Sequence, residues 1–370
     1  MKLKNGYSNW LEIDRGVIIG NIERIREWTG VPTMAVVKAN GYGHGIIEVV
    51  RAAVKAGAPY CGVARLEEAF ELRKAGIDIP VLVLGYTPDE RFAEAFAQAI
   101  SLTFFQPQQL EVLAAAARSA PVPAKIHIKV DTGMSRLGAP PELAYDLLQR
   151  LSEFENVDVE GIFTHFARAD ERYAPTTEWQ LRKFADLLAE IESAGLRPPI
   201  AHAANSAAAL TRPNACFDMV RLGIALYGLA PSSEVELLEG MRPALSWHAR
   251  LSHIHVYPPG SGISYGHVYT TQQEERIGVV PVGYGDGYRR EGGNQVLIHG
   301  RRVPVVGRVC MDQVMVLLDE VPEAEIGDEV VLIGEQGSER ITAEELASHW
   351  NTFNYEVVCG LSARVPRHYK

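Results

Sequence analysis

A lysine followed by a glycine-rich turn is the first feature of this sequence that could do chemistry. The apolar run 34–37 ends on Lys38, and residues 39–45 (ANGYGHG) then bring three glycines, a tyrosine and a histidine. The end of a buried strand desolvates a lysine, which lowers the pKa of its amine and prepares it to form a Schiff base. A lone lysine can also mark where a strand reaches water, so this interpretation depends on the other polar residues of the chain.

A second set of ionisable residues lies on the predicted strand 125–131 (KIHIKVD). Lys125, His127 and Lys129 alternate with apolar residues, so a period of two places all three on one face. In a barrel this face points to the axis, where ionisable groups are costly unless they are paired. The pattern favours a functional site near the upper end of this strand, although an exposed edge strand would show the same alternation.

Two further stretches contain groups that bind anions. Residues 131–138 (DTGMSRLG) form a glycine-framed loop around Arg136, whose planar guanidinium can clamp a carboxylate. Residues 205–208 (NSAA) and 221–228 (RLGIALYG) combine Ser206 with a glycine-opened helix start, which suits a phosphate. A Schiff-base lysine together with a phosphate site favours pyridoxal 5'-phosphate as the cofactor.

The elements that must position these residues follow a regular rhythm. Apolar runs alternate with amphipathic helical patterns every 20 to 40 residues or so, which is typical of βα units. The predicted strands are 34–38, 60–64, 80–84, 100–104, 125–131, 159–165, 200–203 and 218–221. The clearest helical patterns are 66–75, 108–118, 141–154 and 176–194. The sequence therefore predicts an α/β fold with an N-terminal (β/α)8 TIM-like barrel over residues 1–235, while a doubly wound open sheet stays an alternative.

The barrel interpretation collects the polar residues at one end. In such barrels the active-site groups come from the C-terminal ends of the strands. Those ends carry Lys38, Lys129 with Asp131, Thr164 with His165, His202 with Asn205 and Ser206, and Arg221.

The rhythm stops near residue 235, and a C-terminal mostly-β domain is predicted over residues 236–370. Its predicted strands are 245–256, 276–282, 295–299, 303–306, 309–316 and 329–333. Only 342–350 reads as a helix, with Thr342 as its cap and Glu345 three residues on. An alternative boundary assigns the first ten or so residues of the chain to this domain.

Composition narrows the partners and the compartment. The chain has 370 residues, of which 47% are hydrophobic and 22% are charged, and this is ordinary for a globular protein. A formal net charge of -10 argues against a nucleic-acid partner. The four cysteines are scattered and offer neither a zinc spacing nor a disulfide framework. Because no zinc spacing is present, we expect no metal. No window is long and apolar enough for a membrane span or, at residues 1–6, for a signal peptide, so we expect a cytoplasmic protein.

With these residues assembled, the chain resembles the bacterial alanine racemases from about Trp10 to Tyr369. The motifs that carry the resemblance are 35–45 (AVVKANGYGHG), 129–138 (KVDTGMSRLG), 221–228 (RLGIALYG), 264–266 (SYG), 283–287 (GYGDG), 311–313 (MDQ) and 354–356 (NYE). The resemblance implies fold-type III chemistry with pyridoxal 5'-phosphate and a head-to-tail homodimer with shared active sites. The reaction would interconvert L-alanine and D-alanine and supply D-alanine for peptidoglycan.

The resemblance also implies a role for individual residues. The two bases would be Lys38, which also binds the cofactor, and Tyr265 from the other subunit, because inversion needs proton removal and delivery on opposite faces. Arg136, which could also acidify the tyrosine, and Met311 would hold the substrate carboxylate, and Arg221 would face the pyridine nitrogen. The other implied cofactor contacts are Tyr42, His165, Ser206, Gly223, Ile224 and Tyr355. Supporting positions are Lys129, which is carbamylated in many relatives, His202, Tyr284 and Asp312.

Three other functions remain open at this point. A serine or broad-specificity racemase would differ in the volume of the pocket, which Tyr355 and Met311 would keep small. A fold-type III amino-acid decarboxylase would need no tyrosine base on the second face, so Tyr265 argues against it. A non-catalytic pyridoxal-phosphate carrier would have no use for the second domain with its Gly-Tyr motifs.

Overall fold

The computed structural model describes residues 6–370, so the N-terminal residues 1–5 that were inspected for a leader lie outside the described part. The chain divides into two compact units. One unit contains residues 16–41 and 46–242, and is called the barrel unit here. The other contains the described residues up to 15, together with 42–45 and 243–370, and is called the β unit.

The barrel unit is built on an eight-stranded parallel sheet, as the apolar runs predicted. Its strands are β2 (Thr33–Val36), β3 (Tyr60–Val63), β4 (Val81–Val83), β5 (Ile100–Phe104), β6 (Ala124–Lys129), β7 (Val157–Phe163), β8 (Ile200–His202) and β9 (Val220–Leu222). Neighbours in sequence pair from β2 to β8, and β9 returns to pair with β2. Backbone hydrogen bonds from Asp218 to Ala201 (3.0 Å) and from Arg221 to Ala204 (2.9 Å) link the remaining edges. The result is a nearly closed barrel.

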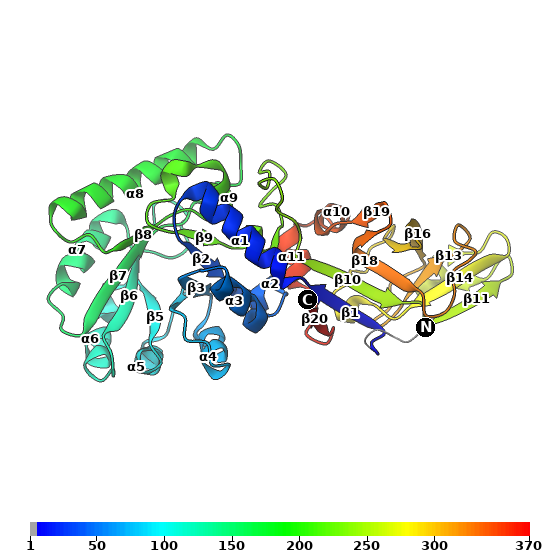
Figure 1. Cartoon of the computed structure of the whole chain (residues 1–370), viewed down its shortest axis with the longest axis horizontal. Helices are drawn as coiled ribbons and strands as arrows, with labels where there is room; N and C mark the ends of the chain where they lie inside the picture. Colours follow the sequence, from blue (N-terminus) through cyan, green and yellow to red (C-terminus); the bar gives the residue numbers. More distant parts are fainter. Residues whose placement is uncertain (1–5) are drawn as a thin grey trace. The chain divides into compact units, whose positions relative to one another are not determined.

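Helices surround this barrel (Figure 1). They are α1 (Arg15–Thr29), α3 (Ile46–Lys55), α4 (Leu66–Lys74), α5 (Phe92–Ala97), α6 (Leu110–Arg118), α7 (Pro141–Leu151), α8 (Pro175–Ser193) and α9 (Ser206–Thr211). Each buries one apolar stripe, as in α8, where the buried residues include Leu181, Phe184 and Leu188. The four helical patterns in the sequence correspond to α4, α6, α7 and α8, with ends that differ by at most three residues.

The β unit contains one large mixed sheet with the order β11-β14-β17-β16-β15-β18-β10-β1-β20. Its strands are β1 (Asn9–Ile13), β10 (Leu245–Arg250), β11 (His253–Tyr257), β14 (Glu275–Val280), β15 (Gln295–Ile298), β16 (Arg301–Val306), β17 (Val314–Leu317), β18 (Glu329–Gln336) and β20 (Arg367–Tyr369). The short strand β19 (Glu339–Ile341) pairs with β18, and β12 (Gly262–Ile263) pairs with β13 (Tyr269–Thr270).

Three predictions for this unit need correction. The predicted strand 245–256 is two strands, because Leu251 and Ser252 turn away and donate their N–H groups to Asp328 and Val279. Of the predicted strand 309–316, only the part from Val314 is a strand, since the preceding residues form a loop. The unit also has a second helix, α11 (Asn354–Cys359).

The helix predicted at 342–350 is present as α10 (Ala343–His349). The Thr342 side chain accepts a hydrogen bond of 3.1 Å from the Glu345 N–H, so the predicted cap is confirmed.

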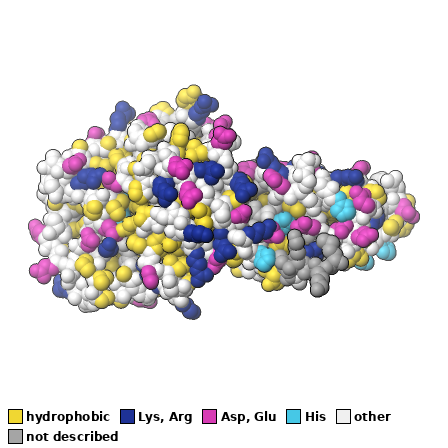
Figure 2. All heavy atoms as spheres, in the orientation of Figure 1, with side chains coloured by type: hydrophobic (Ala, Val, Ile, Leu, Met, Phe, Trp, Pro, Cys, Tyr) yellow, Lys and Arg dark blue, Asp and Glu magenta, His cyan; other side chains and the backbone are white. Residues whose placement is uncertain are grey.

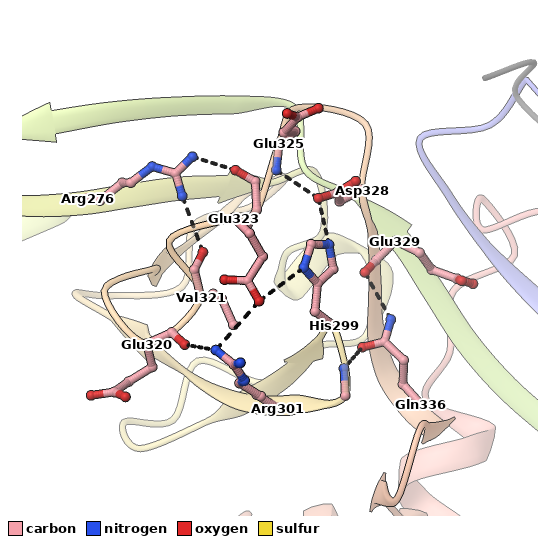
Figure 3. Close-up of polar contacts among 12 residues, drawn as sticks. Arg276, His299, Arg301, Glu320, Val321, Glu323, Glu325, Asp328, Glu329 and Gln336 are labelled. Carbon is pink, nitrogen blue, oxygen red and sulfur yellow. Dashed lines mark hydrogen bonds and ion pairs between the residues drawn. The ribbon is translucent and has the colours of Figure 1, made fainter.

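A polar cluster around His299 fastens turns of the β unit (Figure 3). The His299 ring lies 2.8 Å from Asp328 Oδ2, and Arg301 donates a 2.5 Å hydrogen bond to the Glu320 carbonyl. The Gly300 N–H donates to Gln336 Oε1 at 2.9 Å. The cluster joins the β15–β16 turn to the loop before β18, and we assign it a structural role.

Surface and redox features are simple. On the face shown in Figure 2, acidic and basic side chains both lie over the barrel unit. All four cysteines, Cys61, Cys216, Cys310 and Cys359, are free thiols. Among residues 6–370, no helix combines the length and the apolar character required to cross a bilayer.

Candidate active site

Lys38 lies at the C-terminal end of β2, where the chain enters an unusual turn. Residues 39, 40 and 41 have φ values of 53°, 54° and 60°, so the segment labelled α2 (Lys38–Tyr42) is a left-handed turn rather than a regular helix. Such backbone is strained for Ala39 and Asn40 and must be held by its surroundings. The Ala39 N–H donates to Glu68 Oε1 at 2.6 Å, and the Asn40 side chain accepts from Ile46 N at 3.0 Å.

Glu68 is a residue that the sequence patterns did not single out. Its second oxygen accepts hydrogen bonds from the N–H groups of Ala64 (2.7 Å) and Arg65 (3.1 Å) at the start of α4. One carboxylate thus ties the turn after β2 to the turn after β3. A capping glutamate three residues into a helix is the signal that could have found it.

Lys129 ends β6 inside the barrel, and its ammonium group lies 5.3 Å from the centre of the Phe163 ring. Desolvation, together with the nearby cations Arg136, Arg221 and Lys38, lowers the pKa of Lys129 to about 8. The structure therefore places Arg136, Arg221 and Lys38 close enough to Lys129 for their charges to lower its pKa. A lysine with a lowered pKa has an accessible neutral amine, which carbamylation would require.

The Arg136 loop is closed by its own backbone. The Asp131 N–H bonds the Ala139 carbonyl, and the Ala139 N–H bonds the Lys129 carbonyl, both at 2.8 Å. Asp131 Oδ1 also accepts the N–H groups of Gly133 (2.9 Å), Met134 (2.9 Å) and Ser135 (3.1 Å). The loop presents Arg136 as an exposed side chain on a fixed base.

Arg221 is buried in β9, with only 3% of its surface exposed. Its guanidinium donates to the carbonyl oxygens of Thr164 (2.8 Å), His202 (2.9 Å) and Ala203 (3.0 Å). It also faces ring nitrogens, His202 Nδ1 at 3.0 Å and His165 Nδ1 at 3.2 Å. Burial lowers the pKa of Arg221 to about 9, and burial beside this cation holds the pKa of His165 and of His202 well below 6.5. Both imidazoles are therefore neutral at physiological pH.

The predicted phosphate cradle is formed by Ser206 and the backbone after β9. Asn205 caps α9 by accepting the Ala208 N–H at 3.0 Å, which places Ser206 at the first position of the helix. The Ser206 hydroxyl accepts the Gly223 N–H at 2.9 Å, so Ser206 and the start of the turn Ile224–Tyr227 lie together. The two segments for which the sequence predicts a phosphate site are therefore neighbours, and the binding of phosphate there stays a prediction.

The β unit holds the other predicted residues. Tyr265 is 66% exposed and lines a pocket of about 590 Å³ together with Met311, Asp312 and Gln313. Ser264 before it has φ 63°, a left-handed conformation fastened by the hydrogen bond of its hydroxyl to the Arg308 carbonyl at 2.6 Å. The strained turn fixes how Tyr265 is presented.

Two motifs of the β unit are pinned to each other. The N–H groups of Tyr284 and Gly285 donate to the carbonyls of Cys310 (3.0 Å) and Met311 (2.9 Å). A Cβ on Gly283 would lie 2.3 Å from the Cys310 carbonyl oxygen, so this approach requires glycine. Arg364, another residue that the sequence did not point to, bridges Asp286 (2.7 Å) and Asp312 (2.8 Å).

Tyr42 and Tyr355 are brought together in the β unit, with ring centroids 6.2 Å apart. Tyr42 is buried, and its carbonyl lies 2.9 Å from His44 Nδ1. Tyr355 also contacts Phe353 at a ring distance of 5.2 Å.

Comparison with known proteins assigns the chain to a family. Two family models match, "Alanine racemase, N-terminal domain" over residues 13–231 and "Alanine racemase, C-terminal domain" over residues 244–369. The alanine racemase of Symbiobacterium thermophilum is 45% identical over 100% of this chain and 99% of its own length. That of Geobacillus stearothermophilus is 45% identical over 97% of this chain and 92% of its own length.

Solved structures agree over the full length. A Clostridium difficile alanine racemase superposes with a TM-score of 0.94 at 39% identity and covers 99% of this chain and 97% of its own. The Bacillus anthracis alanine racemase with bound L-Ala-P superposes with a TM-score of 0.93 at 40% identity, covering 100% of this chain and 96% of its own. The chain therefore belongs to the alanine racemase family of isomerases.

Proposed function

We propose that this chain interconverts L-alanine and D-alanine with pyridoxal 5'-phosphate, and that the D-alanine supplies peptidoglycan. The observation that carries the proposal is the cluster around Lys38 at the C-terminal end of the barrel. There the neutral ring of His165 lies within reach of the charges of four cations, which are the buried Arg221, Arg136, Lys129 and Lys38. This set is the one expected for a Schiff-base cofactor and an anionic substrate.

The residues present fit the proposed cofactor. The Ser206 hydroxyl accepts the N–H groups of Gly223 (2.9 Å) and Ala225 (3.3 Å) at the start of a helical turn, and this corner would hold the phosphate. Lys38 would hold the aldehyde carbon, and Tyr42 and Tyr355 would add contacts to the phosphate. When bound, the cofactor would withdraw electrons from the amino acid, so that the hydrogen on its α-carbon becomes acidic.

Inversion requires two proton-transferring groups, one on each face of the α-carbon. Lys38 Nζ would take or give the proton on one face. Tyr265 of a second copy of the chain would do so on the other face, which makes the active enzyme a homodimer. The exposure of Tyr265 and of the neighbouring Met311 (52%) supports this assignment, since large exposed apolar groups around a pocket are suited to a partner surface.

The remaining roles concern binding. Arg136 and the backbone at Met311 would hold the substrate carboxylate, and Lys129 would orient Arg136. Arg221 would donate to the pyridine nitrogen and keep it unprotonated, since a guanidinium gives up its proton reluctantly. A weaker electron sink would favour racemisation over transamination.

The test is the loss of optical rotation in pure L-alanine, with and without added pyridoxal 5'-phosphate, repeated with L-serine and L-lysine. We expect cofactor-dependent loss that is fastest with alanine. In Tyr265→Phe the rate should fall by roughly 10²- to 10⁴-fold with the cofactor still bound. Tyr173→Phe, which alters a tyrosine 85% exposed in the barrel unit, should leave the rate unchanged. Full activity of Tyr265→Phe would exclude the two-base assignment, and release of carbon dioxide would indicate a decarboxylase.

A further inference from the structure

A chain of hydrogen bonds leads from Arg221 through the barrel interior to a carboxylate. Arg221 Nη1 lies 3.0 Å from His202 Nδ1, and His202 Nε2 lies 2.9 Å from His127 Nδ1. His127 Nε2 lies 3.4 Å from Glu160 Oε2. Lys125 binds the other Glu160 oxygen at 2.6 Å, and its own side chain is 45% exposed. The chain thus connects the C-terminal end of the barrel with the solvent-facing start of β6.

This chain of hydrogen bonds matters because Arg221 is a buried cation that has no carboxylate partner among residues 6–370. Its hydrogen-bond partners in the described part of the chain are three carbonyl oxygens and two imidazole nitrogens. A buried charge is costly unless an opposite charge compensates it. Glu160 is the anion that the hydrogen bonds reach.

The two ends of this hydrogen-bond chain, Arg221 and Glu160, allow only one arrangement of protons in which the rings of His202 and His127 are both neutral. A guanidinium can only donate, so His202 Nδ1 must be the acceptor and His202 Nε2 must carry the hydrogen. That hydrogen is donated to His127 Nδ1, which leaves the His127 hydrogen on Nε2, facing Glu160. A carboxylate can only accept, so the Glu160 end requires the same direction. A ring that gained a proton would lose one of these hydrogen bonds.

The Glu160 end is built for this purpose by two features of β7. The register of β6 against β7 shifts between Ile126 and His127, so that Glu160 is an extra, bulged residue. A bulge changes the direction of a side chain, and here it points Glu160 to the same ring that Gly161 faces. A Cβ on Gly161 would come within 2.2 Å of His127 Nδ1, so the ring fits only beside glycine.

Glu160 is held ionised by its neighbours. Burial would raise the pKa of this carboxyl, but hydrogen bonds from His127, Lys125 and Tyr60 outweigh burial and lower it to about 2. Ser101 donates a further hydrogen bond to Oε2 at 3.2 Å. Burial lowers the pKa of His127 as well, so the ring next to this carboxylate stays neutral.

We propose that Glu160 and His127 are positioning residues for Arg221. The carboxylate fixes the hydrogens on two neutral imidazoles, and these hold the guanidinium in one orientation and offset part of its charge from the far side of the barrel. The proton arrangement is a property of the folded protein and does not depend on its activity. Its effect on racemisation rests on the function proposed for Arg221.

The pKa values at the two ends also oppose transfer of the Arg221 proton along these hydrogen bonds. Shifting one proton along each hydrogen bond would leave Arg221 neutral and Glu160 protonated. The pKa of Arg221 is about 9 and that of Glu160 about 2, so this shift is strongly unfavourable. Arg221 therefore remains a cation and a donor even though it is fully desolvated.

The first test measures the positions of the protons in the full-length, cofactor-free protein. Histidine labelled with ¹⁵N in the ring distinguishes the two neutral tautomers and the imidazolium by NMR. His127 and His202 are identified by their mutual contact, since their ring centroids are 5.1 Å apart. We expect both rings to be neutral at pH 6 with the hydrogen on Nε2. A hydrogen on Nδ1 of His202, or an imidazolium at either position, would overturn the proposal.

The second test uses Glu160→Gln, which keeps the shape and removes the charge. The matched control is Thr103→Val, which removes an equally buried hydroxyl from the residue paired with His127 on β5. We expect Glu160→Gln to shift the Nε2–H signal of His202, two hydrogen bonds away, and Thr103→Val to leave it in place. If the His202 signal does not move in Glu160→Gln, the Glu160 carboxylate does not influence the hydrogen on His202, and the proposal is overturned.

Kinetic constants of the variants distinguish a failure of this inference from a failure of the proposed function. With pyridoxal 5'-phosphate and alanine, Glu160→Gln should lower kcat about 10-fold and change KM by less than about threefold, as expected for loss of a positioning contact. Thr103→Val should change neither constant by more than about twofold. Unchanged kcat in Glu160→Gln would remove the positioning role. A wild-type protein that binds the cofactor but does not racemise alanine would instead reject the proposed function and leave the NMR result valid.

Discussion

In the barrel unit Arg221, Lys129 and His202 are buried inside the barrel, whereas in the β unit Tyr265 and Met311 are exposed at the rim of an open pocket. Arg221 is 3% exposed and has five hydrogen-bond partners, while Tyr265 is 66% exposed on a strained turn. Buried polar networks are costly if any member is lost, and exposed side chains contribute little to stability.

Substitutions in the two units should therefore have different effects. The barrel half arranges its charges before any ligand arrives, so changes there should affect folding as well as chemistry. The β-unit half offers an exposed tyrosine and an exposed methionine, so changes there should affect chemistry alone.

The largest effect should follow from removing the barrel lysine. Lys38→Ala should lower racemisation by at least about 10³-fold, because one base and the covalent anchor of the cofactor are lost together. Reduction with borohydride should then fail to fix the cofactor to the protein, as judged by mass. Lys55→Ala, at an exposed position of α3, is the control and should still be labelled. Labelling of Lys38→Ala at another lysine would contradict the assignment.

A smaller effect separates the two units by stability. Gly161→Ala should lower the free energy of unfolding by about 1–3 kcal/mol, because the new methyl group overlaps the His127 ring. Gly292→Ala, with open space around its Cβ position, and Tyr265→Phe should both stay within about 0.5 kcal/mol of the wild type. Urea denaturation measures all three. Equal stability of Gly161→Ala and wild type would mean that the barrel interior is not tightly packed.

A further effect, which appears only as the pH is varied, is a pH dependence of stability that the barrel should show. The pKa of Glu160 is lowered from 4.5 to about 2 in the folded chain, so its ionised form stabilises folding above pH 4.5. This contribution is lost as the pH falls through 2. The unfolding free energy of wild type minus that of Glu160→Gln should therefore be largest above pH 4.5 and shrink toward pH 2, by up to about 3 kcal/mol. A difference that does not vary with pH would show that Glu160 is not ionised in the folded barrel.

Much of the barrel could be predicted because its strands are short apolar runs between clear helix signals. The positions of Lys38, Lys129, Arg221 and Ser206 followed from the ends of these runs, and the structure brings the first three together. Glu160 could not be found this way, because its inward direction depends on a bulge. A bulge is a property of strand pairing, and the only local signal is the glycine that follows.

The β unit was less predictable for related reasons. The predicted strand 245–256 contains neither glycine nor proline around Leu251 and Ser252, so nothing in the local sequence marks the end of β10. Helix α11 has only six residues, too few for a clear period. Arg364 is far in sequence from Asp286 and Asp312, so that its bridge appears only in the folded chain.

The most direct test of the central claim, that the barrel and the β unit supply one base each from different copies of the chain, is complementation. Inactive Lys38→Ala and inactive Tyr265→Phe proteins are mixed, dissociated and reassembled, and racemisation of alanine is measured. Sites shared between two copies should recover about a quarter of wild-type activity, because half of the dimers are mixed and each has one intact site. No recovery, with mixed dimers demonstrated by mass, would place both bases in a single chain and contradict the account.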